Sequence, residues 1–143
     1  MCESLGHGDN EFGIHVFDGE YAEVHLQRWT PIAGYCAVIW RHGHVAEPTD
    51  LAPAEANGYW QEVLAVGRAA AALLSPIKLN YLTLGNTLPH LHTHVVPRYP
   101  HDAAPGAPLA WDQIVTDEPA AETDLRARAI ELRRLLSHGG SGE

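Results

Sequence analysis

Hydrophobic and polar positions divide the chain into short β-prone runs and longer stretches with helical spacing. Residues 14–17 and 21–27 flank the pair Asp18-Gly19, and two β-prone runs joined by Asp-Gly predict a β-hairpin. Residues 35–40 are almost uniformly apolar, so we expect there a strand that is buried on both faces.

The middle of the chain carries the clearest helical pattern. Residues 54–74 are rich in Ala, Leu and Glu, and Pro53 suits the first turn of a helix. Apolar residues at three- and four-residue steps define its expected buried face: Trp60, Val63, Leu64, Gly67, Ala71 and Leu74. A second helix is expected over residues 118–136.

Two more strands, over residues 79–84 and 88–96, are predicted on either side of Gly85-Asn86-Thr87. This order of elements predicts an α+β fold: an antiparallel sheet of about five strands, one long helix packed on it and a C-terminal helix. We expect four segments: a loose N-terminal arm (1–11), a core domain (12–99), a C-terminal loop and helix (100–138) and a flexible tail (139–143).

Composition and charge narrow the classes of function. The chain has 143 residues, enough for one domain, and no apolar stretch suited to a membrane span or a signal peptide, so we expect a cytoplasmic protein. Its formal net charge of -9 has the wrong sign for coating a nucleic-acid backbone. Cys2 and Cys36 form no Cys-x-x-Cys pair, which argues against a disulfide framework or a cysteine zinc site.

Three histidines alternate within the last predicted strand. His90, His92 and His94 share one face of an extended run, while Leu91 and Thr93 lie on the other face. Solvent-facing polar residues of an ordinary strand would be the simplest explanation, although strict alternation of three histidines is rarely accidental. Histidines that lack such spacing are expected at the surface: His7, His15, His25, His101 and His138.

Two kinds of chemistry suit a row of imidazoles. Histidine is the commonest metal ligand, but the outer two residues of the row are about 13 Å apart, so all three can hardly reach one zinc. His42, His44 or a carboxylate would have to complete such a site. The alternative is covalent catalysis, in which one imidazole attacks phosphorus and its neighbours orient it or bind phosphate oxygens. We favour this second chemistry and predict no metal or other cofactor.

The run from His90 to Val96 resembles the signature of the histidine-triad (HIT) family, in which three histidines alternate with apolar residues; Thr93 is the departure. The Pro97-Arg98 that follows is also HIT-like, and the resemblance extends over residues 12–98. It implies an antiparallel sheet with a long helix, a homodimer, and hydrolysis or transfer of nucleotides.

The resemblance also implies roles for individual residues. His92 would be the nucleophile, with His90 and His94 as hydrogen-bonding neighbours. Matching positions upstream imply contacts with the phosphates or the nucleoside for Asn80, Gly85, Asn86, Thr87, His44, Trp29 and Arg28. Such phosphate contacts would stabilise the charge that develops during the reaction.

Three positions depart from the family pattern. Asn86 stands where many relatives carry a longer glutamine, and Arg28 stands where relatives carry a ribose-binding aspartate. Some relatives also have a Cys-x-x-Cys zinc pair near the start, whereas Cys2-Glu3-Ser4-Leu5 lacks the second cysteine. We therefore expect that zinc site to be lost.

These features together predict an enzyme that hydrolyses or transfers nucleotides. It would act on a dinucleoside polyphosphate or nucleoside phosphoramidate through a covalent nucleotidyl intermediate on His92, with a small-molecule nucleotide as its partner and neither nucleic acid nor membrane. Two alternatives stay open: a catalytically weak nucleotide-binding or regulatory module, and a metal-binding protein that uses the histidine cluster.

Overall fold

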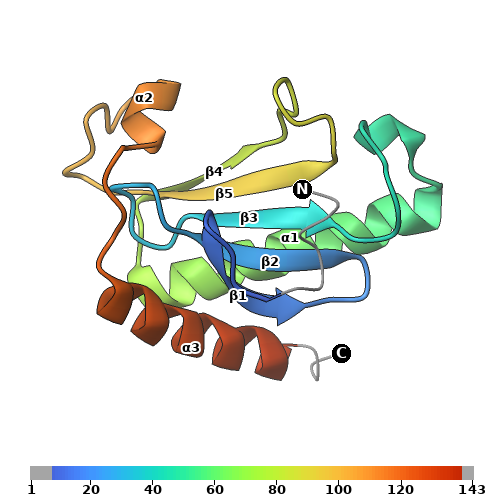
Figure 1. Cartoon of the computed structure of the whole chain (residues 1–143), viewed down its shortest axis with the longest axis horizontal. Coiled ribbons are helices and arrows are strands. Elements are labelled where there is room, and N and C mark those ends of the chain that lie inside the picture. Colours follow the sequence, from blue (N-terminus) through green and yellow to red (C-terminus); the bar gives the residue numbers. More distant parts are fainter. Residues whose placement is uncertain (1–7, 140–143) are drawn as a thin grey trace.

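The computed structural model describes residues 8–139 and has one antiparallel sheet in the order β1-β2-β3-β5-β4. Its strands are β1 (Gly13–Asp18), β2 (Ala22–Gln27), β3 (Cys36–Trp40), β4 (Lys78–Leu82) and β5 (His92–Arg98). The helical segments are η2 (Pro48–Asp50), α1 (Pro53–Leu74), α2 (Trp111–Ile114) and α3 (Glu122–Gly139). Figure 1 shows α1 behind the sheet and α3 beside β1, which confirms the expected α+β fold.

The expected hairpin forms at the start of the sheet. Asp18 pairs with Glu23, and the Gly19 N–H donates to the Ala22 carbonyl at 2.8 Å. Because strand side chains alternate, Val24 and Leu26 enter the core under the helices. Their neighbours in β2 therefore lie on the opposite, open face of the sheet: Glu23, His25 and Gln27.

Helix α1 packs on the sheet through a face that differs from the predicted one. Val63 and Gly67 are buried as expected, but Leu64 and Ala71 are exposed, and the largest side chain in the buried face is Tyr59. The Tyr59 hydroxyl lies 3.0 Å from the Val38 carbonyl and 2.8 Å from the Thr93 hydroxyl. The apolar pattern did not predict that Tyr59 is buried, because a buried tyrosine is tolerated when its hydroxyl forms hydrogen bonds inside the core.

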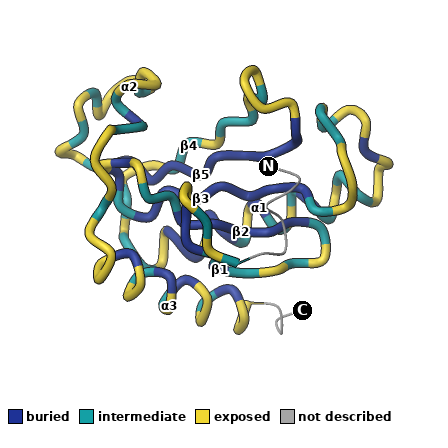
Figure 2. The backbone as a smooth tube through the Cα atoms, in the orientation of Figure 1, coloured by how far each residue is buried: buried dark blue, intermediate teal, exposed yellow. Residues whose placement is uncertain are grey.

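Strand β5 begins later than predicted. It starts at His92 rather than at residue 88. The Leu91 carbonyl still accepts from the Trp40 N–H of β3 at 3.0 Å, but the Leu91 N–H leaves the sheet and donates to the Val45 carbonyl at 2.6 Å. Within β5, Thr93 and Val95 face the helices, so His92 and His94 lie on the open face. Figure 2 shows the resulting buried path along the centre of the sheet.

The segment between β5 and α3 crosses back over the sheet end and is anchored by hydrogen bonds. Thr30 donates from its hydroxyl to the Ile114 carbonyl at 2.6 Å, and Thr116 N–H donates to the Trp29 carbonyl at 3.0 Å. The second helix begins at Glu122 rather than at residue 118, since the preceding Ala120 N–H bonds to the Arg28 carbonyl instead of starting a helical turn.

Some sequence-based expectations fall on parts of the chain that the structure does not describe. The loose arm over 1–11 and the tail over 139–143 rest largely on residues 1–7 and 140–143, and Cys2 and His7 also lie outside the described residues. Within residues 8–139, no helix is long and apolar enough to cross a membrane.

Candidate active site

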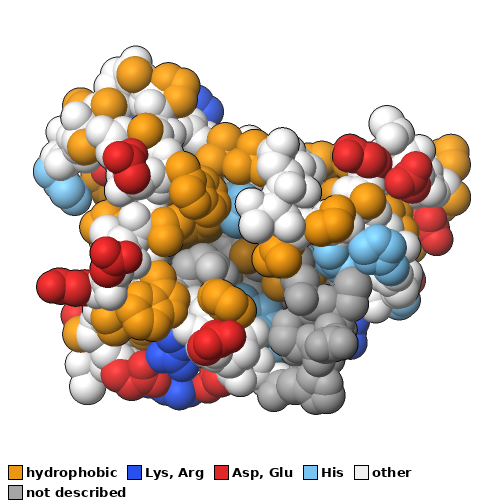
Figure 3. Space-filling view, turned by 45° about the horizontal axis from the view of Figure 1, so that its top comes forward, with side chains coloured by type: hydrophobic (Ala, Val, Ile, Leu, Met, Phe, Trp, Pro, Cys, Tyr) orange, Lys and Arg blue, Asp and Glu red, His pale blue; other side chains and the backbone are white. Residues whose placement is uncertain are grey.

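The open face of the sheet carries the larger cavity, with a volume of about 570 Å³. We call it the main pocket, and its lining comes from the chain before β1, strands β2, β3 and β5, the turn after β4, and α2. Figure 3 shows hydrophobic side chains around a hollow in which histidine is visible. The described lining residues are Asn10, Phe12, His25, Gln27, Trp29, Tyr35, Ala37, Ile39, Leu84, Gly85, Asn86, Thr87, Leu88, His92, His94, Trp111 and Val115.

His92 lies at the start of β5, and one of its ring nitrogens forms a hydrogen bond within the chain. Its Nδ1 lies 2.6 Å from the backbone carbonyl of His90, and a carbonyl only accepts, so Nδ1 carries the proton. No described residue bonds to Nε2. This hydrogen bond selects the tautomer whose lone pair is on Nε2, which is the form that a nucleophile needs.

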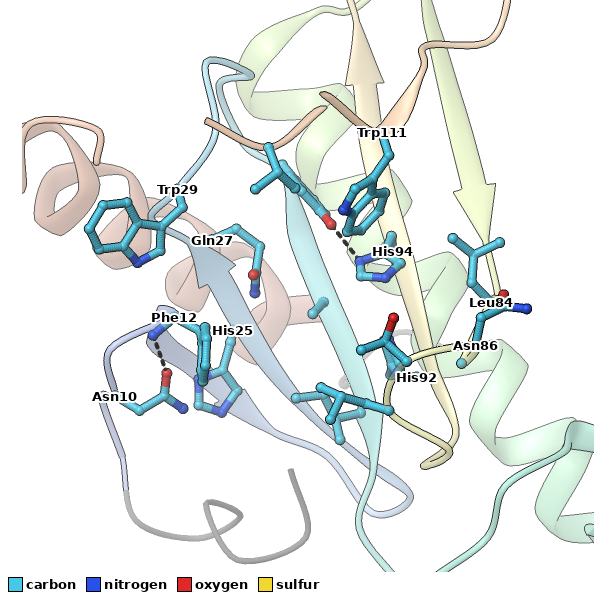
Figure 4. A pocket seen from close by; sticks show the side chains of 17 residues that line it. Asn10, Phe12, His25, Gln27, Trp29, Leu84, Asn86, His92, His94 and Trp111 are labelled. Atoms are coloured by element: carbon cyan, nitrogen blue, oxygen red, sulfur yellow. Dashed lines mark hydrogen bonds between the residues drawn. The ribbon is translucent and has the colours of Figure 1, made fainter. Parts of the chain in front are cut away.

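His94, two residues further along β5, differs from His92 in the partner of its Nδ1, which is a side-chain hydroxyl instead of a backbone carbonyl. Its ring is nearly perpendicular to that of His92, at 86° and 4.8 Å between centroids, and its Nδ1 lies 2.6 Å from the Tyr35 hydroxyl. Burial and, to a smaller extent, the neighbouring His92 together lower the pKa of His94 from 6.5 to about 4. Near neutral pH His94 is therefore uncharged. Figure 4 shows it between Trp111 and His92, joined to Tyr35 by a hydrogen bond.

His90, the first histidine of the triad, lies before β5 and does not line the main pocket. Its Nε2 donates to the Trp40 carbonyl at 2.7 Å, and burial lowers its pKa. A smaller cavity of about 100 Å³ touches both His90 and His92. His44 is exposed, and its ring centroid lies 5.7 Å from that of His90. His90 thus acts on His92 through its backbone carbonyl, while its ring fastens the loop to β3.

The turn after β4 faces His92 across the main pocket. Gly85, Asn86 and Thr87, which the resemblance assigned to phosphate binding, all line the pocket, and Gly85 has φ +81°, a conformation that favours glycine. The backbone N–H groups of Asn86 and Thr87 bond to no carbonyl or side chain of the described chain. This turn therefore offers unpaired donors beside the histidines, where an anion could bind.

The far wall of the main pocket is apolar and aromatic. Trp29 is partly exposed there, held by a 2.7 Å hydrogen bond from its indole N–H to the Glu11 carbonyl. Phe12 and Trp111 are also exposed aromatic residues at the pocket (Figure 4). None of the described lining residues is Lys, Arg, Asp or Glu, so any phosphate there would be held by neutral donors.

Two predicted ligand residues lie outside the main pocket. Arg28 is paired with Glu122 of α3 and also donates to the Asn10 carbonyl at 3.1 Å. The Asn80 side chain accepts a 2.8 Å hydrogen bond from Arg98. The resemblance places Arg28 where relatives carry a ribose-binding aspartate, but alternation in β2 turns Gln27 toward the pocket instead. We therefore assign structural roles to Arg28 and Asn80.

Several pocket residues escaped the sequence analysis, among them three with polar side chains on or beside the central strands: His25, Gln27 and Tyr35. His25, expected at the surface, is only 2% exposed, and its Nε2 lies 2.7 Å from the Glu23 carboxylate. Gln27 and Tyr35 were not predicted as pocket residues, because neither belongs to a sequence motif that indicates a binding site. The alternation of polar residues in β2 was a usable signal for His25 and Gln27, since both occupy the face opposite the apolar Val24.

Among the described residues, the potential metal ligands that lie close together are not the triad histidines, on which the open metal-binding alternative depends. Within residues 8–139, the potential ligand atoms that lie within 4.8 Å of one another belong to His15, Asp18 and Glu23, at the β1–β2 hairpin, and not to the triad. His15 already bonds to Asp18 at 3.0 Å, and the Arg41 guanidinium lies 3.7 Å from the same carboxylate. Hydrogen bonds and an ion pair thus account for this cluster.

Comparisons with known proteins point to one family. The sequence model of the HIT domain matches residues 14–101, and no curated protein matches the chain. A histidine triad protein from Bradyrhizobium japonicum has a similar structure, with a TM-score of 0.78 and 26% identity over 88% of this chain and 92% of its own. One from Marinobacter aquaeolei has a TM-score of 0.76 and 23% identity over 88% and 90%.

A third solved structure, described as a zinc-bound histidine triad family protein from Mycobacterium smegmatis, shares 21% identity over 99% of this chain and 95% of its own, with a TM-score of 0.70. The HIT domain match covers more than half of the chain and spans the sheet, α1 and all three triad histidines. On this evidence, the chain belongs to the histidine-triad (HIT) family.

Proposed function

We propose that this protein hydrolyses or transfers nucleotides through a covalent intermediate on His92. The observation that carries the proposal is the 2.6 Å hydrogen bond from His92 Nδ1 to the His90 carbonyl, which fixes the nucleophilic tautomer beside a pocket of about 570 Å³. A pocket of this volume is within the usual range for small-molecule sites. Family membership supports a nucleotide as the ligand.

The proposed reaction has two displacements at phosphorus. In the first, the Nε2 lone pair of His92 forms an N–P bond while the bond from phosphorus to the leaving group breaks, and the leaving group takes up a proton from water. In the second, water or another acceptor attacks phosphorus and releases a proton to the solvent, which replaces the proton taken up in the first step. The N–P bond breaks, and its electron pair returns to Nε2. Splitting the reaction in this way replaces one difficult displacement by two easier ones.

The remaining pocket residues suit the parts of a nucleotide. The turn 85–87 would hold phosphate oxygens through its backbone N–H groups and the side chains of Asn86 and Thr87, and His94 would add a ring N–H. Trp29 and Phe12 would pack against the base. The substrates that fit this arrangement are dinucleoside polyphosphates and nucleoside phosphoramidates, and His44 would be an ancillary group near the smaller cavity.

The proposal is tested with His92→Asn, which keeps a polar side chain of similar size but removes the nucleophile. Wild type and variant are incubated with adenosine 5′-phosphoramidate and with diadenosine tetraphosphate, and products are separated by chromatography. We expect turnover in wild type and a loss of at least about a thousandfold in the variant. His101→Asn, at an exposed histidine stacked on Tyr99, is the matched control and should behave as wild type.

Intact-mass measurement after acid-free quenching provides a second readout. A nucleotidyl adduct on wild type that is missing from His92→Asn supports the intermediate directly. Equal turnover by the two proteins would exclude the assigned role of His92. Nucleotide binding in calorimetry with no product after long incubation would instead favour a binding or regulatory module.

We also propose a cytoplasmic homodimer, as expected from the family. Strand β4 is an edge of the sheet, and exposed large hydrophobic residues occur beside it and on α1, including Ile77 and Leu64. Exposed apolar residues next to an unpaired strand edge are typical of an interface. Light scattering should therefore give twice the chain mass for wild type and the single chain mass for the double substitution Leu64→Glu and Ile77→Glu; a monomeric wild type would contradict the dimer.

A further inference from the structure

Tyr35 lies immediately before β3 and reaches beneath the main pocket to the ring of His94. Its hydroxyl oxygen is 2.6 Å from His94 Nδ1, and the two ring centroids are 5.5 Å apart. The tyrosine is only 2% exposed and packs with Ile32, Val96 and Ile114, so its hydroxyl is held in place by the core. Figure 4 shows this contact on the side of His94 near Trp111.

The direction of this hydrogen bond follows from the surroundings of both groups. Burial raises the pKa of Tyr35 and lowers that of His94 to about 4, so both are neutral near pH 7. The described residues offer no second partner to the Tyr35 hydroxyl. If His94 donated, the tyrosine O–H would be left buried without an acceptor, which is costly. Tyr35 therefore donates, His94 Nδ1 accepts, and the ring proton of His94 is on Nε2.

We propose that Tyr35 is a positioning residue that holds His94 in the Nε2–H tautomer, so that His94 is a fixed hydrogen-bond donor toward the phosphoryl group attacked by His92. This inference rests on the proposed function. As a consequence, the two histidines have different roles. The His90 carbonyl leaves His92 with a lone pair at Nε2, and the Tyr35 hydroxyl leaves His94 with a proton at Nε2.

A neutral donor in this position helps the reaction without transferring its proton. Negative charge grows on the non-bridging phosphate oxygens during the displacement, and a preorganised N–H lowers the energy of that charge. The described lining of the main pocket contains no Lys or Arg that could take over the same task. A His94 that could adopt either tautomer would present a lone pair to the phosphate oxygen for part of the time, and the two would repel.

The first test is the tautomer itself, measured without substrate. Long-range proton–nitrogen NMR correlations on ¹⁵N-histidine-labelled protein report which ring nitrogen is protonated. We expect wild-type His94 to be protonated at Nε2 only, and Tyr35→Phe to show a mixture of tautomers. Tyr59→Phe is the matched control because it also removes a buried hydroxyl, but on the helix-facing side of the sheet. Protonation of wild-type His94 at Nδ1 would overturn the proposal even if the Tyr35 variant failed to fold.

The second test is kinetic and uses the same three proteins with adenosine 5′-phosphoramidate. Since the donor matters most when charge develops, Tyr35→Phe should lower kcat about tenfold while KM changes less than about twofold. Tyr59→Phe should leave both constants within about twofold of wild type. A folded Tyr35→Phe protein with wild-type kcat would overturn the proposal. If wild type turned over no nucleotide, the proposed function would fail, and the NMR result would still decide whether Tyr35 fixes His94.

Discussion

His92 and His94 show how the same side chain acquires two chemical characters two positions apart. The difference lies in the partner of Nδ1: a backbone carbonyl for His92 and a phenolic hydroxyl for His94. A carbonyl requires a proton on the nitrogen, while a neutral, buried tyrosine supplies one. The character of each imidazole is thus set by the partner of its Nδ1: the backbone of His90 within the triad for His92, and Tyr35 outside the triad for His94.

The low pKa of His94 predicts a loss of stability in mild acid. In the unfolded chain histidine titrates near its ordinary value of 6.5, whereas folded His94 titrates at about 4. Above pH 6.5 both states are neutral and the stability is complete. As the pH falls from 6.5 to 4 the unfolded state takes up the proton first, so the free energy of unfolding should drop by up to about 3 kcal/mol.

Urea denaturation at several pH values between 7 and 4.5 measures this effect. His94→Gln removes the titrating group, so its stability should fall less steeply with decreasing pH than that of wild type. His101→Asn removes an exposed histidine and should follow the wild-type slope. Parallel curves for wild type and His94→Gln would contradict the assigned pKa.

For individual residues, the sequence predicted which face of β5 carries His92 and His94, but not which residues contact them. Alternation placed His92 and His94 on one side of β5, and the turn before it supplied Gly85, Asn86 and Thr87 as pocket residues. It could not reveal Tyr35, because the contact with His94 joins residues 59 positions apart. Nor could it reveal that alternation along β2 turns Gln27 toward the main pocket, while Arg28 lies outside the described lining and pairs with Glu122 of α3.

At the scale of elements, the end of β5 is fixed by a buried ion pair. Arg98 donates from Nε to Asp102 at 2.6 Å, and their side chains are only 4% and 7% exposed. Arg98 also donates to Asn80 of β4 and to the Ala104 carbonyl. Arg98 therefore joins β4, the end of β5 and the loop that leads to α2.

Breaking this pair from one side should destabilise the protein strongly. Asp102→Asn leaves the Arg98 charge buried and uncompensated, which we expect to lower the free energy of unfolding by about 3–5 kcal/mol. The matched control is Glu131→Gln, whose pair with Arg134 is exposed and should be worth less than about 1 kcal/mol. Urea denaturation of both variants at pH 7 checks the contrast, and equal losses would contradict the assigned importance of the buried pair.

The elements themselves were largely predictable, and their boundaries were less so. Apolar alternation and helical spacing located five strands and two long helices, because these patterns follow directly from which faces are buried. The buried face of α1 was rotated in the prediction, since Tyr59 enters the core through hydrogen bonds that hydropathy does not register. The start of β5 depended on Leu91 bonding to Val45, a contact between distant segments.

On the scale of the whole molecule, the helices bury one face of the sheet and leave the other for the main pocket. The full chain carries a formal net charge of -9, yet the described pocket lining contains no Lys, Arg, Asp or Glu. The proposed nucleotide ligand would therefore be repelled at long range by the net charge and held at short range by hydrogen-bond donors of the pocket lining. These two contributions respond differently to salt, because ions screen interactions over distance much more than hydrogen bonds inside a cavity.

This separation predicts an unusual salt dependence for nucleotide binding. Raising the salt concentration from about 20 to about 300 mM screens the repulsion, so the affinity for adenosine monophosphate should stay constant or increase by up to about threefold. Calorimetric titrations at the two concentrations measure it. Gln27→Lys, which places a cation at the pocket, is the comparison variant and should bind more weakly at the higher salt concentration. A wild-type affinity that fell about tenfold would mean that a cation outside the described lining takes part in binding, since neutral donors alone cannot produce such a dependence.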